Sequence, residues 1–311
     1  MKTRSLHWTD LKHLGILGLL GMFWKPELRF FFLFYLISFF EIFSQSKDDA
    51  QVSNKHLRRY FQTFILSQFN PFMFPLQMKQ AFGQVIILFR HLGGFPDRDN
   101  YVNQISYVLP FTGAWKVVKG GSTRVNSHSW EIFTQRYAYD FVIVDERNTS
   151  YSQDGTRLEN YYCFEKEVIS PADGEVITVR DTIRDYTGVG DMSIDWRAKD
   201  FRGNFMIIRH AKNEYSFIAH FRQGTIGVKK GDRVHQGQVL GRCGNTGHST
   251  EPHIHFHLQD RASFWTAMGL PVRFAGLEVT TKTETVARSN DFIETGEVVR
   301  NFASVPGPIL K

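Results

Sequence analysis

The spacing of apolar and polar positions divides the chain into two regions. In the first third, apolar residues form two long runs, at residues 14–24 and 30–43, separated by the charged and helix-breaking KPELR at residues 25–29. From about residue 101 onward, short segments alternate apolar and polar positions between glycine turns, which is the period of half-buried β-strands. We therefore predict an N-terminal helical region over residues 1–100 and a β domain over residues 101–311.

The strand pattern recurs in six segments, at residues 108–118, 137–144, 174–180, 204–210, 214–221 and 254–259. Many short strands of this kind predict a mainly β fold, built as an antiparallel β-sandwich or barrel. Two stretches add a tight glycine turn to β-branched residues, namely SPADGEVI at residues 170–177 and VKKGDRVHQGQVLG at residues 228–241.

The N-terminal apolar runs suggest contact with a membrane. Each run is shorter than the roughly 20 residues that a membrane-spanning helix needs. Basic residues precede the first run as in a signal peptide, but no small-residue cleavage site follows Trp24. The second run, rich in aromatic residues, could form a short anchor, an interfacial helix or a helix buried against residues 61–76. We expect a membrane-associated helix and no cleaved signal peptide.

Charge follows the same division. Lys and Arg number 37 against 31 Asp and Glu, a net charge of +6, and residues 1–104 account for 12 − 7 = +5 of it. This balance suits a protein that works near anionic polymers or lipid head groups, and we expect no nucleic-acid partner. The 42% hydrophobic and 22% charged fractions exclude a disordered chain. Cys163 and Cys243 are too few for a disulfide scaffold or a thiolate zinc site.

Histidines carry the candidate chemistry. In PHIHFH at residues 252–257, His253, His255 and His257 alternate along a predicted strand. Their side chains then project from one face about 6.5–7 Å apart, too far for one metal ion to bind all three. An H-x-H pair lets one imidazole bind zinc while the other stands beside the bound water. By itself the pair is also compatible with an ordinary polar sheet face.

The histidines belong to a longer motif. GNTGHSTEPHIHF at residues 244–256 resembles the G-x-T-G-x-S-x-x-P-H-x-H-F signature of lysostaphin-type (LytM-like) peptidoglycan endopeptidases, and IAHF at residues 218–221 resembles their Y-A-H-L strand. The stretches at residues 170–177 and 228–241 resemble the hybrid motif that this family shares with biotinyl carriers and phosphocarriers. The resemblance covers about residues 108–260 and implies a duplicated hybrid motif fold.

The resemblance also implies roles for particular residues. His255, and Asp140 in YAYDF, match the family's zinc ligands, while His220 and His253 match its two catalytic histidines. Those histidines would bind the metal-activated water and stabilise the oxyanion of the intermediate. The chain would then be a zinc (Zn2+) metalloendopeptidase that hydrolyses peptide bonds of bacterial cell-wall peptidoglycan. A wall substrate implies a location at the cell membrane or envelope, with the catalytic domain outside.

One position departs from the commonest form of the family. There a His ligand stands four residues before the Asp, but this chain has Arg136, which cannot ligate zinc. His128 is the nearest upstream candidate, in a segment similar to a subgroup with an N-x-H element before Q-R-x-A-x-D. We expect His128 to be the third ligand, with His257 as the alternative.

Two other functions remain open from the sequence. If no third ligand exists, the domain is a catalytically inactive relative that serves as a binding scaffold. A phosphocarrier with the same hybrid motif would accept a phosphoryl group on histidine and would need no metal. That alternative gives no reason for Asp140 or for the motif around His253 and His255.

Overall fold

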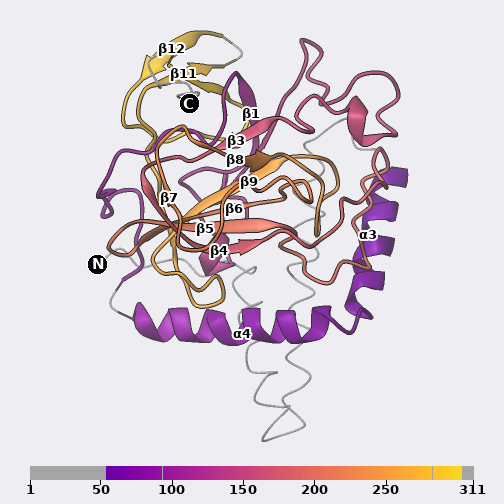
Figure 1. The fold of residues 1–311 in the computed structure, drawn as a ribbon, viewed down its shortest axis with the longest axis horizontal. Helices are drawn as coiled ribbons and strands as arrows, with labels where there is room; N and C mark the ends of the chain where they lie inside the picture. The colour runs from indigo at the N-terminus through magenta and orange to yellow at the C-terminus, as the bar shows by residue number, and fades with distance from the viewer. Residues whose placement is uncertain (1–53, 93, 282, 303–311) are drawn as a thin grey trace, which may run out of the picture. The chain divides into compact units, whose positions relative to one another are not determined.

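The computed structural model describes residues 54–92, 94–281 and 283–302 (Figure 1). The apolar runs at residues 14–24 and 30–43 lie outside the described residues. The described chain begins with two helices, α3 (Asn54–Gln68) and α4 (Met73–Arg90), and continues mostly as strands. Neither described helix is both long and apolar enough to cross a membrane. The domain boundary near residue 100 stays a prediction.

The larger of two described sheets has eleven strands, and all its pairs are antiparallel. Its order is β12 (Thr285–Arg288), β11 (Leu277–Thr280), β13 (Val298–Asn301), β1 (Trp115–Lys119), β2 (Tyr139–Val142), β9 (Ile254–Gln259), β6 (Glu214–Ala219), β5 (Phe205–Ala211), β4 (Gly174–Arg180) and β7 (Arg233–Val234), with β10 (Gly269–Leu270) beside β9. A second sheet pairs β3 (Glu167–Ile169) with β8 (Val239–Arg242). The prediction of a mainly β, antiparallel fold is confirmed.

The hydrophobic core lies between the two sheets. Apolar side chains from both of them meet in one cluster, which includes Trp115, Phe141 and Phe256 from the larger sheet and Val168 and Leu240 from the smaller. Because β12 and β7, the two ends of the larger sheet, do not pair with each other, the sheet stays open. Of the two predicted architectures, the fold is therefore a sandwich and not a closed barrel.

The predicted strand at residues 108–118 is shorter than expected. Only Trp115–Lys119 joins the larger sheet. The preceding residues follow the smaller sheet instead, because the Pro110 carbonyl accepts a hydrogen bond from the Ile169 amide and Phe111 forms a single bridge to Val168. Proline has no amide hydrogen to donate to a sheet, so alternation alone overestimated this strand.

Helix α4 packs closely against the β domain. A Cβ atom on Gly83 would lie 1.7 Å from the Trp265 carbonyl oxygen, so only glycine allows this approach. Ile87, one turn further on, is fully buried, and Arg90 at the end of the helix pairs with Asp260. The contact brings α4 beside the segment that carries His128.

Candidate metal centre and catalytic histidines

The candidate site is assembled by three neighbouring strands, β2, β9 and β6. The register of these strands places Asp140 of β2 opposite His255 of β9, and His255 opposite Ala219 of β6. His220 follows Ala219 directly. Directly opposed residues in an antiparallel pair have Cβ atoms about 4.5–5.5 Å apart, so the register alone brings a carboxylate against an imidazole.

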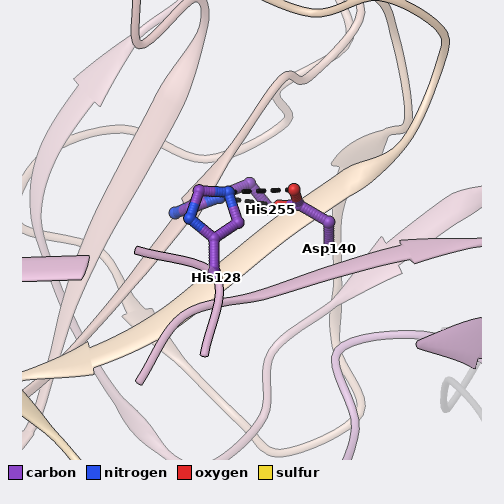
Figure 2. A group of neighbouring side chains, drawn as sticks. All are labelled: His128, Asp140 and His255. Carbon is purple, nitrogen blue, oxygen red and sulfur yellow. Dashed lines mark hydrogen bonds and ion pairs between the residues drawn. The ribbon is translucent and has the colours of Figure 1, made fainter. Parts of the chain in front are cut away.

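His128, Asp140 and His255 converge on one point (Figure 2). His128 Nε2 lies 3.0 Å from Asp140 Oδ2, and His255 Nδ1 lies 2.8 Å from Asp140 Oδ1. One donor atom from each residue lies within 4.8 Å of the others. Two imidazole nitrogens and one carboxylate oxygen are a donor set that zinc accepts at about 2.0–2.2 Å each, so the residues fit a zinc ion.

The loop that brings His128 to the site is fixed by Arg136. The Arg136 guanidinium donates to the Trp130 carbonyl at 3.0 Å, and the Arg136 carbonyl accepts a hydrogen bond from Ser127 Oγ at 2.6 Å. The guanidinium carbon lies 4.8–5.0 Å from the centres of three aromatic rings, those of Phe95, Trp130 and Phe133. Arg136, which cannot bind zinc itself, therefore holds in place the loop that carries His128, the proposed third ligand.

Helix α4 forms hydrogen bonds with the same loop. The Gln84 amide nitrogen donates to the Glu131 carbonyl at 2.6 Å, and its amide oxygen accepts from the Phe133 amide at 2.9 Å. One side chain thus satisfies two backbone groups just after His128. Sequence reasoning missed Gln84 and the Phe95 ring, because no motif joins them to the site.

We expect Arg136→Lys to weaken zinc binding by roughly 10-fold, since outer contacts that orient a ligand typically change metal affinity 10–100-fold. A lysine cannot stack as a plane on the three rings, and its ammonium cannot replace the guanidinium hydrogen bond in the same geometry. Competition with a chromophoric zinc chelator measures the change. Arg147→Lys is the matched control, because that side chain is 85% exposed. Equal affinity in both variants would contradict the role of Arg136.

His220 and His253 lie beside the three convergent residues. Their ring centres are 4.5 Å apart, and His253 Nε2 lies 3.7 Å from Asp140 Oδ1. His220 Nδ1 donates to the Thr246 carbonyl at 2.6 Å, and His253 Nδ1 donates to the Glu251 carbonyl at 2.9 Å. A carbonyl can only accept, so in the neutral form of each ring Nε2 carries the lone pair. Both histidines can therefore accept a proton at Nε2.

His220 has an unusual backbone. Its φ angle is 67°, in the left-handed region, directly after β6 ends at Ala219. Residues other than glycine seldom adopt this conformation, and such strain is concentrated at functional sites. The Gly244 amide donates to the His220 carbonyl at 2.9 Å and holds the turn in place.

Charges within the cluster reinforce one another. Burial by itself would raise the pKa of Asp140. The charges of His128 and His253, together with hydrogen bonds from His128 and His255, have the larger effect and hold that pKa well below its ordinary value. Burial lowers the pKa of His128, yet the Asp140 carboxylate raises it above the ordinary value. Burial first, then repulsion from His253 and His255, holds the pKa of His220 well below its usual range. Asp140 is thus an anion beside a neutral His220.

His257 takes another place. Its Nδ1 lies 3.1 Å from His255 Nε2, on the opposite side of the His255 ring from Asp140. Among the described residues, the convergent donor group contains His128 and leaves out His257. The geometry therefore favours His128 over His257 as the third ligand, and the ligand roles themselves stay predictions.

Part of the chain is similar to known peptidases. Residues 153–265 match the family model described as Peptidase family M23, a span that contains His220, His253 and His255 and begins after His128 and Asp140. The chain is 27% identical over 164 residues to the peptidoglycan DD-endopeptidase ShyC of Vibrio cholerae, covering 45% of this chain and 37% of that protein. It is 36% identical over 73 residues to ShyA of the same organism, covering 24% and 16%.

The match to these relatives is partial. The chain spans well under half the length of either curated relative. Among solved structures, the catalytic domain of lysostaphin from Staphylococcus simulans is 20% identical, with 55% of this chain and 90% of that chain covered and a TM-score of 0.27.

Proposed function

We propose that this chain is a zinc metalloendopeptidase acting on bacterial peptidoglycan. Residues 153–265 match peptidase family M23, the family that the motifs predicted. The observation that carries the proposal is the convergence of His128, Asp140 and His255 beside two histidines whose Nε2 atoms are free to take a proton. The names of the relatives support the substrate class, since ShyC and ShyA are peptidoglycan DD-endopeptidases.

The three convergent residues would hold the zinc ion and leave a fourth position for water or substrate. When bound, zinc would lower the pKa of water and polarise a peptide carbonyl. His253 would take the proton of the attacking water at Nε2, and the Asp140 carboxylate 3.7 Å away would stabilise the imidazolium that results. His220, which keeps a lone pair at Nε2, would accept a hydrogen bond from the attacking water, and His253 would return the proton it took to the leaving amine.

The proposal is tested by hydrolysis and metal content measured together. Purified full-length protein is incubated with isolated peptidoglycan, and released peptides are identified by mass spectrometry. We expect hydrolysis that stops on chelation and returns with added zinc. Bound metal without hydrolysis of any wall peptide would favour the scaffold, and phosphorylation of a histidine without metal would favour the phosphocarrier.

His128→Ala tests the third proposed ligand. We expect this variant to lose zinc and hydrolysis together, because two protein ligands leave the ion over-hydrated and weakly bound. His235→Ala is the control, since that imidazole is 83% exposed. Zinc content by elemental analysis and peptide release are measured on both proteins. Unchanged zinc in His128→Ala would remove this residue from the proposed site.

We also propose that the protein works in the cell envelope with its catalytic domain outside the membrane. The peptidoglycan substrate of its relatives and the apolar run at residues 30–43 support this location. Protease added to intact spheroplasts should digest the β domain. Protection of that domain until the cells are lysed would place it on the other side of the membrane.

A further inference from the structure

Helix α4 is apolar on both sides. On its inner side Gly83 and Ile87 meet the β domain, and Met73 is buried as well. Its outer side exposes Phe74 by 56% and Phe89 by 67%, and Leu92 just beyond the helix by 73%. A surface helix ordinarily turns polar residues outward, so this outer face is suited to an apolar environment.

The exposed apolar residues continue before the helix. In the turn from α3 to α4, Phe69 is 80% exposed and Phe72 is 51% exposed. Large aromatic side chains left at a surface in such numbers mark a site of interaction with a protein or a membrane. We name the exposed side chains of Phe69, Phe72, Phe74, Phe89 and Leu92 the α4 outer face.

The segment that carries this face is basic. Residues 54–92 contain five Lys and Arg and neither Asp nor Glu. Of these, Arg58 and Lys79 are exposed, whereas Arg59 and Arg90 pair with Asp191 and Asp260. Exposed aromatic side chains beside basic ones match the interface of a bilayer that contains anionic lipids.

We propose that the α4 outer face lies in the interfacial layer of a membrane with anionic lipids, with the helix in the membrane plane. The inner side of the same helix grips the His128 loop through Gln84. The candidate metal centre would therefore stand next to the membrane surface.

Fluorescent probes on the full-length protein test this surface. Phe74→Cys and Phe89→Cys are each labelled with an environment-sensitive dye, which the buried Cys163 and Cys243 do not take up. On vesicles of phosphatidylcholine and phosphatidylglycerol we expect blue-shifted emission and quenching by lipid-borne quenchers at both positions. The control is Ala287→Cys, an exposed position on β12, where emission should not change.

Three outcomes would overturn the proposal. Aqueous emission from both α4 probes in the presence of the anionic vesicles would show that α4 stays out of the interface. Blue-shifted emission before any vesicle is added would show that another part of the chain, or a second copy, covers the face. Equal shifts on pure phosphatidylcholine would refute the charge argument.

A second feature concerns the strand that carries the metal ligand. His255, His257 and Gln259 alternate along β9 and are all buried, the last two completely. His255 Nε2 lies 3.1 Å from His257 Nδ1, and His257 Nε2 lies 2.9 Å from the Gln259 amide oxygen. The Gln259 amide nitrogen donates to the Arg261 carbonyl at 2.7 Å. Three polar side chains thus form one continuous chain of contacts.

The direction of each contact follows from the far end. The Arg261 carbonyl can only accept, so the Gln259 amide nitrogen faces it and the amide oxygen faces His257. That oxygen needs a donor, so His257 carries a proton on Nε2. A neutral, fully buried His257 then offers the lone pair of Nδ1, and His255 must donate from Nε2.

This order of donors determines what can bind at His255 Nδ1. With a proton on Nε2, whatever lies between His255 Nδ1 and Asp140 Oδ1, which are 2.8 Å apart, must be a cation. It is either a second proton or a metal ion. We infer that His257 and Gln259 are positioning residues that fix the Nε2–H form of His255 and so keep Nδ1 for the metal, an inference that rests on the proposed metal role of His255.

Variants of His257 test the inference by zinc affinity. His257→Phe keeps an aromatic ring against Phe217, whose centre lies 4.8 Å away, and removes the acceptor. We expect zinc to bind 10–100-fold more weakly, as when other outer contacts to ligating histidines are lost. His257→Gln, whose amide oxygen can accept from His255, should restore affinity to within a few-fold of the parent. Parent-like affinity in His257→Phe would overturn the inference.

Nitrogen NMR of the histidine rings shows which ring nitrogen carries the proton, a property that would not change if His257 had only a structural role. In the zinc-loaded parent we expect His255 to carry its proton on Nε2, and His257 to show the Nε2–H form with and without zinc. A proton on His257 Nδ1 would refute the chain of donors. A protein that meets these expectations yet hydrolyses no wall peptide would sink the proposed function and leave this inference standing.

Discussion

His255→Ala protein is expected to purify almost free of zinc, whereas the parent chain is expected to hold about one zinc ion per molecule. The physical reason is the register of β9 with β2, which places His255 opposite Asp140 and makes these two side chains the centre of the donor set. Asp140→Ala should behave in the same way, since its two oxygens face both imidazoles. Elemental analysis of dialysed protein measures the effect.

The control for metal loss is again an exposed histidine, His235→Ala. Circular dichroism should show that the His255→Ala protein keeps its strands, because the core residues between the sheets are untouched. Full zinc occupancy in the His255→Ala protein would end the assignment of this site. Chelated parent protein should regain hydrolysis when zinc is returned.

His220→Ala and His253→Ala should each lower turnover on peptidoglycan by roughly 10²-fold or more while zinc stays bound. Each ring is anchored through Nδ1 to a backbone carbonyl, which leaves Nε2 for proton transfer. Neither histidine belongs to the three-residue donor set. Turnover and zinc content must be measured on the same samples.

Asn variants sharpen this prediction. A side-chain amide at position 253 or 220 can donate a hydrogen bond but cannot take a proton at neutral pH, so it separates oxyanion binding from general base catalysis. We expect His253→Asn to be as inactive as His253→Ala if His253 is the base. Loss of zinc in parallel with activity would show that ligand and catalyst had been exchanged, and near-parent turnover in both alanine variants would require different chemistry.

The sequence predicted the kind of fold and most strand positions, because alternation of apolar residues records burial on one face. The strands at residues 174–180 and 254–259 have the predicted bounds. The segment at residues 108–114 failed, since its alternation belongs to a contact with β3 through Pro110 and Phe111. Burial against a second sheet produces the same pattern as membership in the first.

The site was harder to predict than the strands. The H-x-H spacing on β9 can be recognised locally, but 115 residues separate Asp140 from His255, and only the register of β2 with β9 makes them neighbours. Arg136 appeared to be a defect because its aromatic partner Phe95 and the clamp from Gln84 are contributed by distant segments. A spacing rule records which residues usually bind, and it carries no information on how a loop is supported.

The clamp of α4 on the His128 loop has a consequence for protein engineering. A chimera that borrows only the β domain, from residue 101 to the C-terminus, would leave Gln84 and Phe95 behind. Such a chimera would carry every strand and every histidine of the site. The His128 loop would nevertheless lose its two hydrogen bonds to Gln84, and Arg136 would lose one of its three aromatic neighbours. The smallest portable unit that keeps this site intact therefore begins before α4, at a border that no alignment of strands would suggest.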